Sequence, residues 1–194
     1  MAIVTYGGTD NVTISNNNLF IHSTNGGYVY GIDSSVYGSD YSSYSASPTN
    51  HNVINNTVAI MGTVSMAEGI YYDELVNANI SNNIVAIMAN DGDLYGVALS
   101  YSYANANPEN VTIDNNKIAI VGTNMVYGVE LSDVKSINVT NNDIYAISEG
   151  GAFAVAAQGN DLLIDSNSLN TYSASTDGIT SWDSFGVGNQ SAHV

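Results

Sequence analysis

The chain has 194 residues and no Cys, and its 18 acidic residues against two basic ones give a formal net charge of −16. The lack of Cys excludes disulfides and thiolate metal sites, and the acidic balance argues against nucleic acid, anionic membranes and acidic polysaccharides, which call for Lys or Arg. Charged residues are only 10% of the sequence, so we expect a surface made mostly of Asn, Ser, Thr and Tyr.

Six copies of a short motif organise the chain. Each copy consists of a short strand, a corner whose second residue is Asn, and another short strand. One apolar residue precedes the corner, and a second follows at the same spacing in every copy. The pairs are Ile14 and Leu19, Val53 and Val58, Ile80 and Val85, Ile113 and Ile118, Val139 and Ile144, and Ile164 and Leu169. Recurrence at one spacing identifies a repeat protein.

A third short strand follows each motif at a looser distance and reads Tyr-Gly-Ile or a variant of it, at 30–32, 68–70, 95–97, 127–129, 153–155 and 177–179. No segment shows a sustained helical period. Successive motifs start 39, 27, 33, 26 and 25 residues apart, and the shortest spacing suits one coil of three strands. Stacked coils of this kind form a parallel β-helix, in which each strand pairs with its equivalent one coil along.

The corner asparagines have a physical reason to recur. Asn tolerates the left-handed conformation of a sharp bend, and stacked amides can hydrogen-bond from coil to coil. The first corner position is Ser once, at Ser166, whereas the second is always Asn. We therefore predict a ladder of second-position residues, namely Asn17, Asn56, Asn83, Asn116, Asn142 and Asn167.

The two ends lack a recognisable cap. Counting back from Ile14 as from Val139 places Val4 level with Val129, so residues 3–6 are predicted to be the third strand of an incomplete coil. Because terminal repeats need a cap and open strand edges recruit other chains, we expect residues 1–194 to be a single-domain segment of a longer array that associates end to end. No run approaches membrane-spanning length, so we expect no direct membrane insertion.

The repeat resembles the right-handed parallel β-helix of the pectin-lyase-like superfamily. Its Asn-Val-Thr-Ile strands, Asn-Asn corners and Tyr-Gly-Ile/Val strands are more narrowly similar to the adhesin-like surface proteins of methanogenic archaea. The resemblance covers nearly the whole chain and implies an all-β, right-handed, single-stranded parallel β-helix of about six coils. It also implies an extracellular or cell-surface location, with signal and anchor outside this segment. The fold carries lyases, hydrolases, phage tailspikes and adhesins alike, so it leaves the function open.

The acidic residues do not form a convincing catalytic pair. Glycosidases need two carboxylates about 5 to 9 Å apart, but Asp114 and Asp165 are two coils apart, and Asp33 and Glu130 are three coils apart on the third strand. We therefore predict no catalytic residue. A carbohydrate-active enzyme with its site on the third-strand face, near Tyr71 and Glu130, remains the alternative.

The basic residues and the candidate metal-binding residues also argue against a catalytic or metal site. Enzymes of the resembled superfamily use Arg or Lys near clustered acids, whereas this chain has no Arg, and Lys117 and Lys135 lie at different corners. Asp91, Gly92 and Asp93 resemble half of a calcium loop but lack its later Glu, which favours a plain turn. We predict no metal and no cofactor.

Two insertions, at 36–50 and 101–109, fall at the same predicted corner and carry tyrosines outside the coil register. Loops on one edge of a rigid scaffold often carry function, and Tyr combines a flat apolar face with a hydroxyl. The hypothetical binding patch, with the third strand between the loops, comprises Tyr37, Tyr41, Tyr44, Tyr71, Tyr72, Tyr101 and Tyr103. The alternative is that these rings cover the apolar stems of their own loops.

The first hypothesis is thus a non-catalytic, adhesin-like β-helix that acts as a stalk and as a binding surface. Its partner would be a carbohydrate or a host or cell-surface protein, and the acidic surface favours a neutral or cationic ligand. A purely structural spacer is a further alternative.

Overall fold

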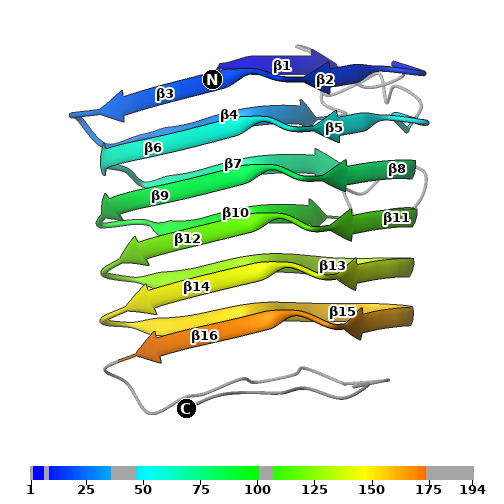
Figure 1. Ribbon diagram of the computed structural model, residues 1–194. Coiled ribbons are helices and arrows are strands. Elements are labelled where there is room, and N and C mark those ends of the chain that lie inside the picture. The colour runs from blue at the N-terminus through cyan, green and yellow to red at the C-terminus, as the bar shows by residue number, and fades with distance from the viewer. Residues whose placement is uncertain (1, 7–8, 36–46, 101–106, 174–194) are drawn as a thin grey trace.

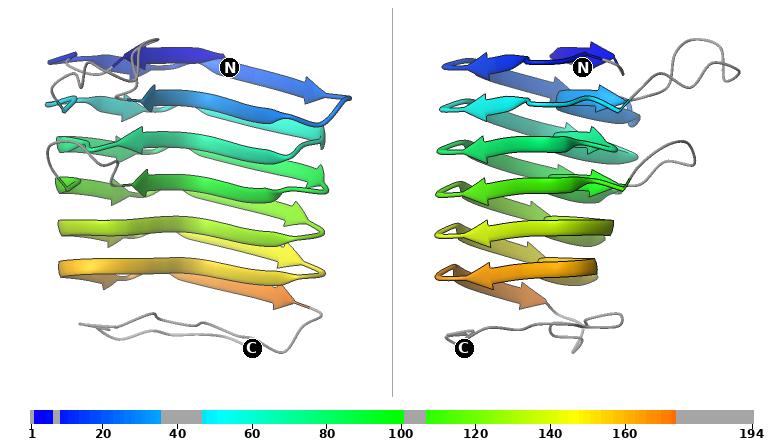
Figure 2. Two further views of the ribbon diagram at one scale, coloured as in Figure 1. Left: turned by 180° about the vertical axis from the view of Figure 1, so that it is seen from behind. Right: turned by 90° about the vertical axis from the view of Figure 1, so that its right-hand side faces the viewer.

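The computed structural model describes residues 2–6, 9–35, 47–100 and 107–173, which form sixteen β-strands (Figure 1). This part of the chain contains no helix, and so none long and apolar enough to cross a membrane. The strands lie in successive layers, as the two views of Figure 2 also show. All their pairings are parallel and join strands of neighbouring repeats.

The first sheet has six strands, seen in front in Figure 1, in the order β16-β14-β12-β9-β6-β3. Each repeat contributes the strand that follows its Asn corner. They are β3 (Asn18–Ser23), β6 (Thr57–Thr63), β9 (Ile84–Asn90), β12 (Lys117–Gly122), β14 (Asp143–Ser148) and β16 (Ser168–Ser173). This is called the six-stranded sheet below.

The second sheet has ten strands and curls into two arms. The third-strand arm contains β1 (Ile3–Tyr6), β4 (Tyr28–Ser35), β7 (Met66–Asp73), β10 (Asp93–Ser100) and the first halves of β13 (Met125–Thr140) and β15 (Gly151–Asp165). The first-strand arm contains β2 (Thr13–Ser15), β5 (Asn52–Ile54), β8 (Val76–Ser81), β11 (Glu109–Asp114) and the second halves of β13 and β15. A register shift between Leu131 and Val134 marks where β13 passes from one arm to the other. The protein is therefore an all-β structure of parallel strands in curled sheets.

The core lies between the sheets and consists of the apolar residues that flank the Asn corners. Val58, Val85, Ile118 and Ile144 occupy one register column of the six-stranded sheet and are at most 1% exposed. Burying a side chain of this kind contributes about 1.5–3 kcal/mol. The spacing that recurs in the sequence thus marks inward-facing positions on successive strands.

The two corner positions have different tasks. Residues at the first position adopt left-handed backbone angles, with φ between 52° and 59°; they are Asn16, Asn55, Asn82, Asn115, Asn141 and Ser166. At the second position each Nδ2 donates to the Oδ1 of the next asparagine, from Asn17 through to Asn167, over 2.9–3.1 Å. The same Oδ1 also accepts the backbone N–H of the asparagine one repeat before it. The first residue bends the chain, and the second satisfies the buried polar groups at the bend.

Glycine recurs on the third strand because the backbones approach closely there. A Cβ at Gly96 would lie 2.4 Å from the carbonyl oxygen of Gly128 and 2.5 Å from Ile118 Cγ2. Gly31, Gly69 and Gly128 meet equivalent obstacles. This explains the Tyr-Gly-Ile pattern: the glycine admits the neighbouring backbone and fixes the outward position of the residue before it.

The N-terminal strand occupies the predicted third-strand position, but its predicted register is wrong by one residue. Ile3, and not Val4, pairs with Ile32 and so lies in the column of Val129. Ile3 packs against the core. A slip of one residue exchanges the two faces of a strand, and the chain between Ile3 and the first corner is one residue longer than its counterpart after Val129.

Candidate functional site

A groove of about 950 Å³ lies on the outer face of the third-strand arm, where β7, β10, β13 and β15 run side by side. Its lining includes Glu68, Tyr71, Tyr95, Tyr127, Glu130 and Phe153. Each of these residues directly follows a buried residue of its strand, for example Ala67 before Glu68, Leu94 before Tyr95 and Val129 before Glu130, as expected where adjacent side chains face opposite sides of a sheet.

Aromatic rings form one column of this face. Tyr30, Glu68, Tyr95, Tyr127 and Phe153 share a register position. The Tyr95 and Tyr127 rings stack with centroids 4.9 Å apart, and those of Tyr127 and Phe153 are 5.1 Å apart. Rings stacked along the column cover each other's faces. Glu68 interrupts the column, so Tyr95 has a carboxyl-bearing neighbour on the side away from Tyr127.

A second column crosses the groove and contains Asp33, Tyr71, Ala98 and Glu130. The Tyr71 hydroxyl donates to Asp73 Oδ1 and lies 2.9 Å from Ser100 Oγ, which donates to the same Asp73 oxygen over 2.7 Å. This network fixes the ring of Tyr71. Burial, with the charge of Asp73, raises the pKa of Tyr71, so its hydroxyl remains protonated. The small side chain of Ala98 separates it from Glu130.

Glu68 is the most unusual group in the groove. Its side chain is 5% exposed, and its Oε2 has no hydrogen-bond partner among the described residues. Burial raises its pKa to about 8, and the charges of Asp33, Asp73 and Glu130 add to the effect. At pH 7 the Glu68 carboxyl is therefore mostly protonated and can donate a hydrogen bond as well as accept one.

The neighbouring carboxyl groups are shifted in the same direction. Burial raises the pKa of Asp33 to about 6, with a contribution from Asp73, and burial raises the pKa of Glu130 against a hydrogen bond from Ser132. The described lining contains no Lys, Arg or His. The floor of the groove is thus less negative at neutral pH than its composition suggests.

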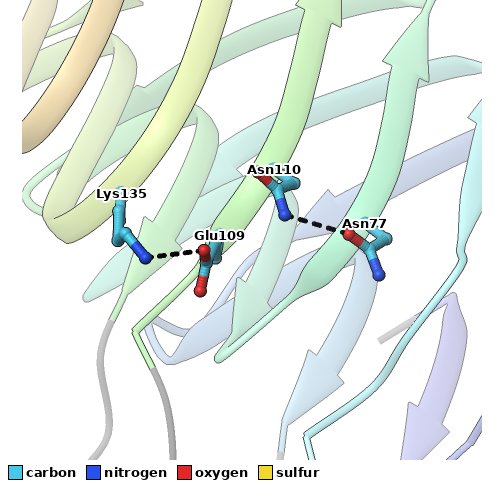
Figure 3. A network of polar contacts seen from close by, with 4 residues as sticks. All are labelled: Asn77, Glu109, Asn110 and Lys135. Atoms are coloured by element: carbon cyan, nitrogen blue, oxygen red, sulfur yellow. Dashed lines mark hydrogen bonds and ion pairs between the residues drawn. The ribbon is translucent and has the colours of Figure 1, made fainter.

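The two basic residues lie elsewhere. Lys135 Nζ lies 2.8 Å from Glu109 Oε1, and the neighbouring Asn110 amide donates to Asn77 Oδ1 over 3.2 Å (Figure 3). The pair joins β11 to the second half of β13 on the first-strand arm. Both side chains are substantially exposed, so solvent screens the ion pair and it adds little to stability. Lys117 lies on the six-stranded sheet.

The turn that resembles half of a calcium loop is hydrogen-bonded to the following repeat. Asp93 Oδ1 accepts the backbone N–H of Met125, and the Asn124 amide donates to the Asp91 carbonyl oxygen. These bonds connect one repeat to the next. Within the described residues no three His, Asp or Glu side chains gather in a way that could hold a metal ion.

Of the predicted patch, Tyr71 lines the groove but Tyr72 does not. Tyr72 is fully buried, and its ring packs edge-on against His51 with its hydroxyl 3.3 Å from His51 Nδ1. Its assignment to a binding surface is wrong, because adjacent residues of a strand face opposite sides and Tyr71 takes the outer one. The remaining patch residues lie outside the described part of the chain; they are Tyr37, Tyr41, Tyr44, Tyr101 and Tyr103.

The stems of both insertions are described and meet at one corner. The Val76 amide donates to the Pro48 carbonyl oxygen over 3.0 Å, and the Glu109 amide donates to the Leu75 carbonyl oxygen over 2.9 Å. The corner at 74–76 therefore lies between the ends of the two insertions, next to the strand that carries Tyr71.

Sequence reasoning missed Glu68 as a site residue. The available signal was a departure from the repeat, because Glu68 stands where four of the other five repeats have an aromatic residue before Gly or Ala. Asp33 and Glu130 do share a column, three repeats apart, but the groove forms around Glu68, two repeats before Glu130. Comparison with known proteins adds no relative: no protein-family model, curated protein or solved structure matches the chain.

Proposed function

We propose that the chain is a right-handed parallel β-helix of about six coils that acts as a non-catalytic, adhesin-like surface segment and binds a carbohydrate in the groove of the third-strand arm. Three strands per repeat, each paired with its equivalent one repeat along, support the coil. A Cys-free, acidic and otherwise neutral polar composition supports an extracellular or cell-surface location.

The observation that carries the binding proposal is the unpartnered Oε2 of Glu68 on the groove wall. A buried polar atom without a partner costs about 1–3 kcal/mol, and a ligand hydroxyl would remove that cost. A sugar offers hydroxyls of both donor and acceptor character together with apolar C–H faces. The protonated Glu68 carboxyl, the tyrosine hydroxyls and the aromatic column match these groups.

Size and charge restrict the ligand. The groove volume of about 950 Å³ falls within the range of small-ligand sites, about 300–1,000 Å³. The net charge of −16 and a described lining without basic side chains disfavour uronic acids and sulfated sugars. The ligand is therefore a neutral or cationic saccharide.

Glycan-array screening followed by calorimetric titration tests the proposal. Glu68→Leu removes the hydrogen-bonding group and keeps the position buried, so affinity should fall at least about tenfold, equivalent to one lost hydrogen bond to the ligand. Glu109→Leu makes the same exchange on the first-strand arm and should leave affinity unchanged. Equal affinities of all three proteins, or no bound glycan in the screen, would contradict a carbohydrate site in this groove.

A second candidate function, glycoside hydrolysis, is favoured by one observation: Glu68 and Glu130 line one groove, and both have a raised pKa. Hydrolysis needs a protonated carboxyl group beside the glycosidic oxygen and an ionised one across the sugar, so Glu68 would be the acid. Release of reducing ends from a neutral polysaccharide, lost in both Glu68→Gln and Glu130→Gln, would establish the enzyme. Binding without release supports the adhesin.

A further inference from the structure

The outer face of the six-stranded sheet is exposed and apolar. Of the eight large apolar side chains that are exposed in the described residues, six belong to this face. They are Phe20, Met61, Ile84, Met88, Tyr145 and Tyr172. Phe20 is 71% exposed and Tyr172 67%. A contiguous apolar area on a sheet face is characteristic of an interaction surface rather than of scattered surface residues.

Few of the described charged residues lie on this face. Among the described acidic residues only Asp143 belongs to the six strands, and the adjacent strand places Lys117 beside it at the same register position. Two chains of charge −16 repel one another, but the repulsion is weakest where their surfaces are neutral. Salt screens the remaining charges over about 8 Å at physiological ionic strength.

Side-chain size along the sheet is complementary to itself. One register column carries, from β3 to β16, Phe20, Ala59, Ala86, Ala119, Tyr145 and Asn170. A two-fold axis parallel to the strands and between β9 and β12 reverses the order of the strands but keeps the column. It sets Tyr145 against Ala59 of a second copy and Ala86 against Ala119, so the large ring meets a small residue. This is the self-complementarity of an isologous interface.

The two flanking columns obey the same operation. One of them carries Met61, Met88, Val121 and Ile147 on its four middle strands, and the axis sets Met61 against Ile147 and Met88 against Val121. In the other column the axis sets Ile84 against the aliphatic stem of Lys117, whose charged end can reach the rim. We propose that this face is the interface of a symmetric dimer of two copies of the chain.

The area is sufficient for a reversible dimer. Six strands about 4.8 Å apart, each with three outward residues, cover about 29 by 20 Å, which gives about 1,200 Å² over both copies. Specific interfaces begin near this value. We therefore expect a dissociation constant in the micromolar range. The partner on this face is a second copy of the chain, which presents the same small and large residues in the reverse strand order.

Sedimentation equilibrium from about 5 to about 500 µM, spanning the expected dissociation constant, tests the proposal. The wild-type chain should shift from monomer to dimer and stop there. Ala86→Glu places two charges near the two-fold axis and should leave a monomer over the whole range. Leu163→Glu makes a similar change at an exposed apolar residue on β15 and should preserve the dimer. A wild-type monomer at the highest concentration, or a dimer unaffected by Ala86→Glu, overturns the proposal.

The pairing of Tyr145 with Ala59 allows a sharper test. Tyr145→Ala should weaken the dimer about tenfold by removing the ring, a loss equal to about 1.4 kcal/mol. Ala59→Tyr in the same chain moves the ring to the opposite member of the pair, so the double variant should recover the wild-type dissociation constant. If the double variant is as weak as Tyr145→Ala, the proposed axis is wrong. End-to-end association would instead give masses that keep growing with concentration and that do not respond to these changes.

Discussion

Glu68 and Tyr95 occupy the same register position on the adjacent strands β7 and β10, so a carboxyl group neighbours a ring where the next two strands stack ring on ring. In the described repeats this column, from Tyr30 to Phe153, is thus aromatic except at Glu68. Glu68 is buried, and its Oε2 has no hydrogen-bond partner among the described residues. A ligand at this position can supply that missing hydrogen bond.

The pH dependence of stability should report on Glu68. In the unfolded chain this carboxyl loses its proton near its ordinary value of 4.5, whereas in the folded protein its pKa is about 8. Between these values folding takes up a proton, so stability should fall as the pH rises, by up to about 1.4 kcal/mol per pH unit. Asp33, with a folded pKa of about 6, should add to the slope below that pH.

Urea denaturation at pH 5, 6, 7 and 8 measures this slope. Glu68→Gln cannot ionise, so its stability curve should be flatter, and the variant should exceed the wild type at pH 8. Equal slopes for the two proteins would show that Glu68 titrates normally in the fold. The general repulsion in a chain of charge −16 acts in both proteins and cancels in the comparison.

The Asn ladder should be expensive to interrupt. Asn83→Ala removes an amide that is 1% exposed and that donates to both Asn116 Oδ1 and the Val53 carbonyl oxygen. We expect a loss of about 1–3 kcal/mol in the free energy of unfolding. Asn18→Ala, on an exposed position after the corner, should cost little. Similar small losses at both sites would remove the ladder as a source of stability.

The first corner position should respond mainly to backbone conformation. Asn82 has φ of 58°, and its Oδ1 accepts an exposed hydrogen bond from the Asn115 amide over 2.6 Å. Asn82→Ala and Asn82→Gly both lose this bond, so the alanine variant should be less stable than the glycine variant by about 1 kcal/mol. At Asn83, by contrast, glycine and alanine should both lower the free energy of unfolding, because both lack the amide that forms the ladder. Chemical denaturation of the four variants distinguishes the two tasks, and equal effects of alanine and glycine at Asn82 would contradict the assignment.

The glycine of the third strand should not accept a methyl group. Gly96→Ala places a Cβ 2.4 Å from the Gly128 carbonyl oxygen and 2.5 Å from Ile118, so neighbouring strands must move apart. We expect a loss of about 1–3 kcal/mol or more. Ala154→Gly, at the same register position on β15, tests the reverse exchange and should cost about 1 kcal/mol or less. A thermal unfolding series that tolerates Gly96→Ala would show that the strands can separate at little cost.

Much of the architecture follows from sequence spacing, because inward positions must remain apolar in every repeat. The pairs that begin with Ile80 and Ile113 recur at fixed distance, and these residues are fully buried. The register of β1 was missed because counting through an irregular segment tolerates an error of one residue. Tyr72 was misplaced because adjacent tyrosines give no signal of which one faces inward.

The groove was harder to predict for a different reason. Its walls come from β7, β10, β13 and β15, and the insertion at 101–109 separates β10 from β13. Glu68 and Glu130 therefore lie at no regular repeat spacing in the chain. Their raised pKa depends on burial, which pattern alone does not reveal. Only the departure of Glu68 from an aromatic column was visible in the sequence.

The corner between the two arms has a consequence for engineering. β13 passes this corner as one continuous strand, whereas two other repeats carry the insertions 36–50 and 101–109 there. The strands that follow these insertions, β5 and β11, still pair in parallel with the equivalent strands of neighbouring repeats. Loop closure costs grow only slowly with length, so the corner at Asp133, with φ of 52°, is a natural grafting point. A foreign peptide inserted there would be displayed beside the groove. Inserting it at the same corner of another repeat would move it along the stack in steps of one strand spacing.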